Sequence, residues 1–282
     1  MSADLTRART ERGEVVRVER LGSLIELTVT LPWLAATAAP GQFAQLRCGD
    51  GIEPLLRRPF SVAWTENDRC GFVFEEVGAG TRLLAALRPG DMLDVLGPLG
   101  TGFDIETGGG PVVCVSGGVG CAPFPLLIAA LRERGAGDIM VLSGAATASR
   151  LYPAERFARG IDGVTVREAT DDGTRGTRGL VTALAPRALD DAPRALYACG
   201  PNAMLAALWE LLECAPAQPD VVEASLEAPM GCGFGTCLGC ALPVRGADAE
   251  PAWALCCTDG PVMPMRDVDW NAVRALPGAD VA

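Results

Sequence analysis

The first hundred residues alternate between apolar and polar positions at the period of a β-strand. Ile25, Leu27 and Val29 are separated by polar residues, which predicts a strand with one buried face. Further strands are predicted at 72–74 and 92–96. Turn-forming pairs lie between these segments at Pro40-Gly41, Asn67-Asp68 and Pro89-Gly90. Many short strands with regular turns predict a small antiparallel β-barrel.

From Pro111 onwards the apolar residues come in short unbroken runs, which is typical of buried strands. Helix-like stretches lie between these runs; one begins after Pro153, and in another, over 204–212, leucines recur at helical spacing. Alternating strands and helices predict an open parallel α/β sheet. The apolar runs are at 112–115, 139–142, 164–166 and 196–199.

This pattern divides the chain into three predicted domains. The β-barrel domain covers residues 10–105, the α/β domain 106–218 and a cysteine-rich domain 219–282. The proline-containing segment 215–219 is interpreted as the linker before the last domain. The cysteine-rich piece is too small to be stable by itself, so a metal centre is expected in it.

Composition narrows the possible partners. The chain has 282 residues, of which 49% are hydrophobic and 21% charged, and its net charge is −11. Nucleic acids and anionic membranes would repel such a chain, so neither is expected as a partner. No signal-like start and no long apolar span is evident, so a cytoplasmic location is expected.

The chain contains eleven cysteines and no histidine. Without an export signal, reduced thiols are expected in place of a disulfide framework, and some of them are candidate metal ligands. The absence of histidine excludes Ser-His-Asp and Cys-His catalysis and the mixed ligands of a Rieske centre.

Three cysteines near the C-terminus, Cys232, Cys237 and Cys240, have the C-x4-C-x2-C spacing of a plant-type 2Fe–2S cluster. Glycines lie between them, as expected for a loop that wraps around a cluster. A four-cysteine zinc site is the alternative, but its ligands usually come in two separated C-x2-C pairs. Spacing alone leaves either Cys256 or Cys257 as the fourth ligand. A cluster of this kind transfers single electrons.

Two segments of the predicted barrel suit a phosphate group. The guanidinium of Arg58 can make paired hydrogen bonds to a phosphate, and Ser61 follows on the same predicted strand. The small residues Gly78 and Gly80, with Thr81, allow a pyrophosphate to approach backbone N–H groups. The alternatives are an ordinary surface strand and an ordinary turn before a helix.

Two loops of the predicted α/β domain suit a nucleotide. Each follows a buried strand and precedes a helix, so both are expected at the carboxyl edge of the parallel sheet. A third segment, 170–173, is either another loop of this edge or a solvated turn, and the turn is favoured. The first loop holds Gly117, Gly118 and Gly120, and the second holds Cys199, Gly200 and Pro201.

Together these motifs resemble the electron-transfer subunits of class 1B dihydroorotate dehydrogenase, in the ferredoxin–NADP reductase-like superfamily. The resemblance extends over about 13–262 and includes the motif 97–103 and the C-terminal Asp259-Gly260-Pro261-Val262. It implies a ferredoxin reductase-like FAD-binding antiparallel barrel, a parallel-sheet NAD-binding domain and a small C-terminal 2Fe–2S domain.

The resemblance also implies the roles of individual residues. In the motif Arg58-Pro59-Phe60-Ser61, Arg58 would contact the FAD phosphates and Ser61 would lie near the isoalloxazine ring. Gly78, Gly80 and Thr81 would hold the FAD pyrophosphate, and the two α/β loops would bind NAD. The implied cluster ligands are Cys232, Cys237, Cys240 and Cys257.

The implied activity is electron transfer with a partner. A catalytic FMN-containing dihydroorotate dehydrogenase subunit would supply electrons, which pass through the cluster and FAD to NAD+, in a heterotetramer. Pro229 and Met263 depart from the family, which usually has a polar residue and an aromatic there. The rival hypotheses are an NAD(P)H-oxidising subunit of a hydrogenase-like or glutamate-synthase-like complex, and a zinc-stabilised nucleotide-binding regulator.

Overall fold

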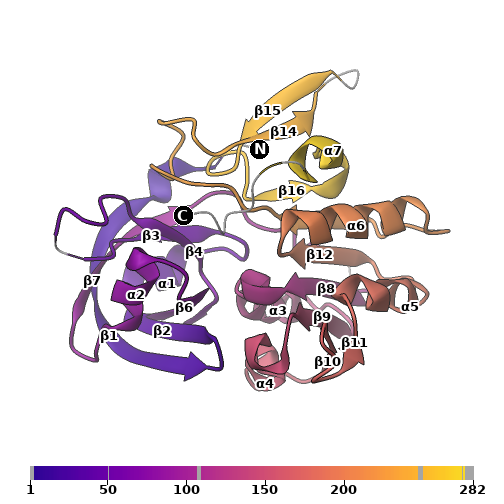
Figure 1. The fold of residues 1–282 in the computed structure, drawn as a ribbon, viewed down its shortest axis with the longest axis horizontal. Coiled ribbons are helices and arrows are strands. Elements are labelled where there is room, and N and C mark those ends of the chain that lie inside the picture. The colour runs from indigo at the N-terminus through magenta and orange to yellow at the C-terminus, as the bar shows by residue number, and fades with distance from the viewer. Residues whose placement is uncertain (1–2, 50, 107–108, 247–249, 275, 277–282) are drawn as a thin grey trace.

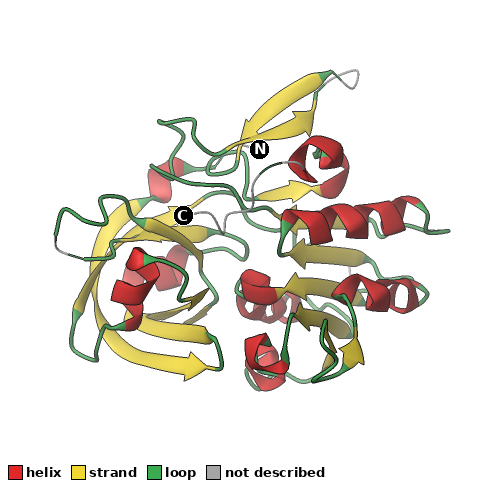
Figure 2. Cartoon of the chain, viewed as in Figure 1, coloured by secondary structure: helices red, strands yellow, loops and turns green. Residues whose placement is uncertain are grey.

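The structure is a computed structural model that describes residues 3–49, 51–106, 109–246, 250–274 and 276. Two seven-stranded sheets lie side by side, and a small hairpin caps them (Figure 1). Figure 2 shows that the first sheet curls into a barrel, whereas helices cover the second sheet. The predicted pairing of an antiparallel barrel with a parallel α/β sheet is confirmed.

The barrel is antiparallel throughout, with strand order β4-β3-β7-β1-β2-β6-β5. The strands predicted at 72–74 and 92–96 lie within β6 and β7. The strands are β1 (Arg9–Leu21), β2 (Leu24–Thr30), β3 (Phe43–Leu46), β4 (Arg58–Ser61), β5 (Trp64–Glu66), β6 (Arg69–Glu75) and β7 (Met92–Leu99). Helices α1 (Pro32–Thr37) and α2 (Ala79–Ala85) connect them, and the 3-10 helix η1 (Leu5–Arg7) precedes them.

The second sheet has the order β11-β10-β9-β8-β12-β13-β16, and only β16 runs antiparallel to its neighbour. All four apolar runs are confirmed as parallel strands. The strands are β8 (Val112–Gly117), β9 (Ile139–Ala145), β10 (Val164–Thr170), β11 (Thr177–Arg178), β12 (Ala195–Cys199), β13 (Val221–Ser225) and β16 (Val262–Pro264). The helices are α3 (Phe124–Glu133), α4 (Ala154–Ala158), α5 (Ala185–Leu189), α6 (Asn202–Glu213) and α7 (Trp270–Arg274).

Short 3-10 helices and one hairpin complete the fold. The hairpin consists of β14 (Ala241–Arg245) and β15 (Pro251–Leu255). Because β13 and β16 join the parallel sheet, that sheet extends beyond residue 218. The division into three domains stays a prediction. The 3-10 helices are η2 (Gly118–Cys121), η3 (Ala148–Arg150), η4 (Val181–Leu184) and η6 (Met265–Asp267).

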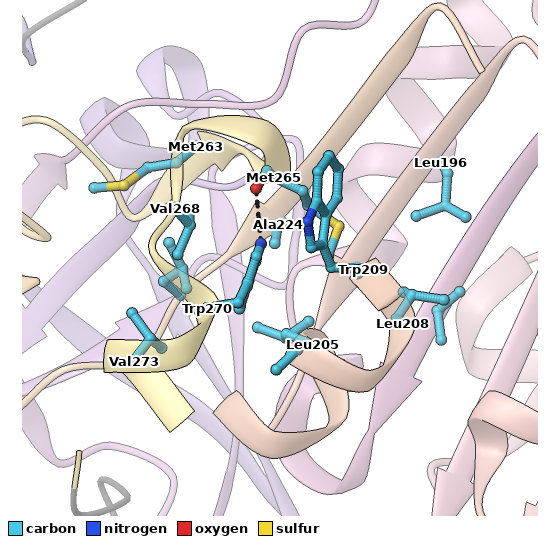
Figure 3. Packing of buried hydrophobic residues seen from close by; sticks show 14 of the residues in the cluster. Leu196, Leu205, Leu208, Trp209, Ala224, Met263, Met265, Val268, Trp270 and Val273 are labelled. Atoms are coloured by element: carbon cyan, nitrogen blue, oxygen red, sulfur yellow. Dashed lines mark hydrogen bonds between the residues drawn. The ribbon is translucent and has the colours of Figure 1, made fainter. Parts of the chain in front are cut away.

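The C-terminal segment packs against α6 and the sheet in one continuous core (Figure 3). The indole Nε1 of Trp270 donates a 2.7 Å hydrogen bond to the carbonyl oxygen of Met265, which closes the turn from η6 into α7. Leu205 and Val273 lie in the same cluster as Cys240 and Cys257. The segment that carries the cysteines is therefore anchored on the α/β domain.

The expected half-exposed character of β2 is wrong. Its burial pattern is almost continuous, and Glu26 and Thr28 are only 3% and 7% exposed. The reason is tertiary, because residues near α4 cover the outer face of this strand. The hydroxyl of Tyr152 and the guanidinium of Arg156 both hydrogen-bond to the Glu26 carboxylate. Glu26, a polar position of the alternating pattern, thus lies in the contact between the barrel and the α/β domain.

Candidate functional site

The barrel motifs predicted to bind phosphate come together around Gly80. A Cβ placed on Gly80 would lie 3.2 Å from Cγ and 3.3 Å from Nε of Arg58, and 3.0 Å from Sγ of Cys48. Arg58 therefore crosses directly over the start of α2, and a side chain at residue 80 would press against it. Pro59, Phe60 and Ser61 continue along β4.

The hydroxyl of Thr81 is engaged within its own turn. It accepts hydrogen bonds of 2.9 Å from the backbone N–H groups of Val77 and Gly78, and it donates to the Gly78 carbonyl. A cavity of about 520 Å³ adjoins this turn. Thr81 therefore stabilises the turn at the start of α2, and its predicted contact with a pyrophosphate stays a prediction. The cavity is lined by Glu53, Pro54, Ala79, Arg82 and Leu83.

The two nucleotide-loop candidates lie against each other at the carboxyl edge of neighbouring strands. Cys199 pairs in register with Ser116, the residue before the first glycine loop. A Cβ on Gly120 would collide with the backbone of Cys199 and Gly200. The loop from Gly117 to Gly120 enters η2 before α3 begins, so its backbone turns tightly at this edge. The structure confirms the predicted juxtaposition of the two loops.

The contacts of the second loop explain its small residues. Gly200 has φ +152°, and a Cβ there would lie 2.8 Å from Cε of Met204 and 3.0 Å from N of Gly117. Pro201 precedes the first turn of α6. Gly118 has φ +56°, and a Cβ placed on it would have no neighbour within 4 Å, so this side of the loop is open to a ligand. Close backbone approach is what a nucleotide phosphate requires of such an edge.

Two polar atoms at this edge are buried without a hydrogen-bond partner among the described residues. They are Oγ of Ser116 and Oδ1 of Asn202. A native buried polar group is nearly always satisfied, and a bound ligand is one way to satisfy it. The sequence pattern did not single out either residue, although each directly adjoins a predicted loop. The chemistry of the edge therefore fits a polar ligand such as a dinucleotide.

The pKa of the Cys199 thiol is raised, mainly because the thiol is buried. The nearby Glu227 carboxylate raises this pKa further. Burial likewise raises the pKa of Cys121, which lies in η2 next to the first glycine loop. Both thiols are therefore protonated at neutral pH. Protonated thiols at the nucleotide edge can pack against a ring but cannot serve as bases.

The four predicted cysteine ligands are arranged as two pairs. The backbone N–H of Cys237 lies 3.4 Å from Sγ of Cys232, and Sγ of Cys240 lies 3.2 Å from Sγ of Cys257. The N–H of Gly235 donates a 3.2 Å hydrogen bond to Sγ of Cys257. Among the residues that the structure describes, no three Cys, Asp or Glu side chains form one single-ion group.

Cys232 and Cys257 differ in their protonation. Burial opposes ionisation of Cys232, but hydrogen bonds from the N–H groups of Phe234 and Cys237 outweigh it and lower its pKa to about 6. Burial and the hydrogen bond with Cys240 raise the pKa of Cys257 to about 12. Cys232 is thus largely a thiolate at neutral pH, whereas Cys257 keeps its proton until a positive group displaces it.

Cys256, the other candidate for the fourth ligand, points elsewhere. Its thiol is fully buried and donates a 3.4 Å hydrogen bond to the carbonyl oxygen of Leu226. Cys257, in contrast, contacts both Cys240 and the loop at Gly235. The contacts of the two thiols therefore favour Cys257 as the ligand.

Comparison with known proteins decides the family. Residues 227–269 match the iron-sulfur cluster binding domain of dihydroorotate dehydrogenase B. The electron transfer subunit of dihydroorotate dehydrogenase B (NAD(+)) from Geobacillus thermodenitrificans is 38% identical over 250 residues, which cover 86% of this chain and 91% of the relative. The corresponding subunit from Bacillus caldolyticus is 40% identical over 248 residues with the same coverage. The chain belongs to this family of electron transfer subunits.

Solved structures of related proteins have the same fold as this dihydroorotate dehydrogenase B electron transfer subunit. A structure described as an NADH-dependent reduced ferredoxin-NADP oxidoreductase superposes with a TM-score of 0.80 at 28% identity, covering 93% of this chain and 91% of the other. A ferredoxin NADP+ reductase from Neisseria gonorrhoeae gives a TM-score of 0.63 at 18% identity, covering 77% and 99%. The ferredoxin reductase-like fold is thus confirmed.

Membership in this family makes the chain an electron-transferring oxidoreductase subunit with a catalytic partner subunit. Within the described part of the chain, none of the helices is both long and apolar enough to cross a membrane.

Proposed function

We propose that this chain carries electrons between a partner subunit that oxidises dihydroorotate and NAD+, through a 2Fe–2S cluster and FAD. The pairing of Cys232 with Cys237 and of Cys240 with Cys257 carries the proposal, because the N–H of Cys237 donates to Sγ of Cys232 and the thiols of Cys240 and Cys257 touch. A two-iron cluster needs two thiolates on each iron, whereas a zinc ion needs four thiolates converging on one point. Two pairs within one loop system fit the two-iron cluster.

The order of the cofactors follows from their chemistry. Nicotinamide exchanges a hydride, the cluster exchanges single electrons, and a bound flavin supplies both kinds of exchange. The barrel side chains would bind and orient FAD, with Arg58 and Gly80 toward its phosphates and Ser61 toward its ring. The open edge at Gly118, together with Ser116 and Asn202, would hold NAD.

Cys199 would position or shield the nicotinamide ring and would not move a proton. Its thiol is buried at the end of β12, and burial raises its pKa. Hydride transfer itself needs no protein acid or base, which agrees with a chain that has no histidine. We expect Cys199→Ala to reduce NADH-to-flavin rates, and unchanged rates would remove this role.

The partner that we propose is an FMN-containing catalytic subunit, and the complex is a heterotetramer. The three-domain division and a cytoplasmic location are part of the same proposal. The cysteine loop is where such a partner would dock, because Cys237 is exposed beside the exposed side chains of Phe234 and Leu238. Electrons can then leave or enter the cluster over a short path.

The decisive experiment is co-expression with the catalytic subunit, followed by an assay of dihydroorotate-dependent NAD+ reduction. We expect a brown complex that contains iron, acid-labile sulfide and FAD and that reduces NAD+ when dihydroorotate is added. A complex without this activity would contradict the dihydroorotate reaction. A colourless chain with zinc and no labile sulfide would contradict the whole proposal.

A second candidate function has the same electron-transfer chemistry but a different partner protein. The similarity to the NADH-dependent reduced ferredoxin-NADP oxidoreductase, and Pro229 and Met263 next to the cysteine region, favour an NAD(P)H-oxidising subunit of another reductase complex. The same preparation distinguishes the two, because this candidate reduces an artificial acceptor with NADH but forms no active complex with the dihydroorotate-oxidising subunit.

A further inference from the structure

Gln45 lies in the middle of β3 with its carboxamide fully buried and unpartnered. The residue is 0% exposed, and neither Nε2 nor Oε1 has a hydrogen-bond partner among the described residues. Leaving a buried polar group without a hydrogen bond destabilises the folded state. A native fold that keeps such a group therefore implies a partner that is supplied from outside the chain.

The side chain of Gln45 points away from the barrel interior. Successive residues of a strand face opposite sides of the sheet. Ala44 and Leu46 belong to the core of the barrel, whereas Phe43 belongs to the cluster that includes Cys240 and Cys257. Gln45 shares the face of Phe43, so its amide faces the cysteine-rich segment.

The amide reaches the cysteine loop itself. A Cβ on Gly233, the residue directly after Cys232, would lie 2.7 Å from Nε2 of Gln45 and 2.8 Å from its Cγ. Gly233 also has φ +84°, in the left-handed region that favours glycine. The missing side chain at this position allows the loop backbone to lie directly on the carboxamide.

Gln45 also adjoins the flavin motif. It pairs in register with Pro59 of β4, directly next to Arg58 and Phe60. The β3–β4 pair thus has the flavin motif along one strand and the cysteine loop packed against the other. A polar group at this place lies between the two proposed redox centres.

We propose that Gln45 is a hydrogen-bond donor from the barrel to the iron–sulfur cluster, with its Nε2–H directed at a cluster or cysteine sulfur. Hydrogen bonds to the sulfurs of a cluster are one of the factors that set its reduction potential. Because the reduced cluster carries one more negative charge, a donor stabilises the reduced form and raises the potential. Gln45 would therefore favour electron residence on the cluster over the flavin.

The first test is Gln45→Met in the complex with the catalytic subunit, since methionine has similar length and flexibility but no donor. An EPR-monitored redox titration should show a negative shift of the cluster midpoint potential. A tenfold change in the one-electron equilibrium between cluster and flavin corresponds to ~59 mV. The FAD potentials should stay within error of wild type. An unchanged cluster potential, or a shift of the FAD alone, overturns the proposal.

Gln42→Met is the matched control. Gln42 is three residues away, but its amide is satisfied, since it accepts from the N–H of Ala39 at 2.9 Å and donates to the Gly100 carbonyl at 2.8 Å. Its replacement should lower stability and leave the cluster potential unchanged. An equal shift in both variants would mean that packing, not donation, sets the potential.

The wild-type protein provides a test that does not depend on the folding of a variant. The chain has three glutamines, at 42, 45 and 218, and Gln218 donates to the Leu212 carbonyl. Labelling the glutamine side chains with 15N should add a weak nitrogen coupling to the pulsed-EPR spectrum of the reduced cluster. Its absence overturns the proposal even if Gln45→Met loses the cluster.

The role of Gln45 rests on the proposed function, but different results would contradict the role and the function. If the wild-type complex has no 2Fe–2S EPR signal, the proposed function is wrong. If the signal is present but shows neither the nitrogen coupling nor the shift in Gln45→Met, only the role of Gln45 is wrong.

Discussion

The hydroxyl of Tyr152 lies 2.8 Å from Oε2 of Glu26, so a buried hydrogen bond joins the α/β domain to the barrel. Arg156 donates to the other carboxylate oxygen at 3.0 Å and also to Glu19. Burial, followed by the charge of Glu26, raises the pKa of the Tyr152 hydroxyl, which therefore remains a donor at all physiological pH values. This contact holds the barrel against the α/β sheet.

Replacing Tyr152 by Phe should lower the free energy of unfolding by about 1–3 kcal/mol, because Glu26 keeps its burial and loses a neutral donor. Glu26→Ala should cost about 1–3 kcal/mol as well, because the buried Tyr152 hydroxyl then loses its acceptor, whereas Arg156 keeps its hydrogen bonds to Glu19. Urea unfolding of each variant measures both values. The control is Glu66→Gln, an exposed carboxylate 3.8 Å from Arg159, for which about 0–1 kcal/mol is expected. Equal costs for Glu26 and Glu66 would contradict the buried contact.

The two adjacent cysteines should behave oppositely. Cys257→Ser should lose the cluster, because its thiol faces Cys240 and the N–H of Gly235. Cys256→Ser should retain it, because a serine hydroxyl can still donate to the Leu226 carbonyl. Iron and acid-labile sulfide per chain, together with the visible spectrum, distinguish the variants. Loss of the cluster in Cys256→Ser with retention in Cys257→Ser would reverse the ligand assignment.

Arg58→Ala should weaken FAD binding, because a charge-assisted hydrogen bond to a phosphate is removed from the barrel. Such hydrogen bonds contribute about 1.5–3 kcal/mol, so the Kd for FAD should rise roughly 10- to 100-fold. Fluorescence of released flavin during dilution measures this change. Arg88→Ala, at an exposed arginine after α2, is the control and should bind FAD like wild type. Equal weakening in both variants would point to a general charge effect.

Glu223 should make stability depend on pH. Burial raises the pKa of its carboxyl, although the N–H of Asp104 donates to it at 2.8 Å. A carboxyl whose pKa is raised on folding contributes stability that is present at low pH and is lost as pH rises through the folded pKa. Glu223→Gln should therefore gain stability relative to wild type over the pH range above the ordinary pKa of a glutamate carboxyl. Urea unfolding across this range tests it, and a constant difference between the two proteins would contradict it.

The sequence alone determined most of the strands and helices and predicted the candidate site residues. Period-2 alternation predicted the barrel, and short apolar runs predicted the parallel sheet. The reason is that alternation indicates a strand with one buried face, whereas an unbroken apolar run indicates a strand with both faces buried. The cysteine spacing predicted an iron–sulfur cluster, and the glycine loop predicted a nucleotide site. Few other kinds of site have these residue types at these spacings. The cysteines are Cys232, Cys237 and Cys240, and the glycines are at 117, 118 and 120. Each of these signals is local in the chain.

Only the tertiary structure decided the contacts between distant segments. Period-2 alternation assigned Glu26 to a solvent-facing side, but the approach of Tyr152 and Arg156, more than a hundred residues away, buried it. Likewise, spacing left Cys256 and Cys257 equivalent until one thiol faced Cys240 and the other faced Leu226. The amide of Gln45 lies beside Gly233 and has no hydrogen-bond partner among the described residues, and nothing local in the sequence indicates this. Burial and hydrogen bonding depend on what the folded chain brings next to a residue, and a pattern of neighbours in sequence does not contain that information.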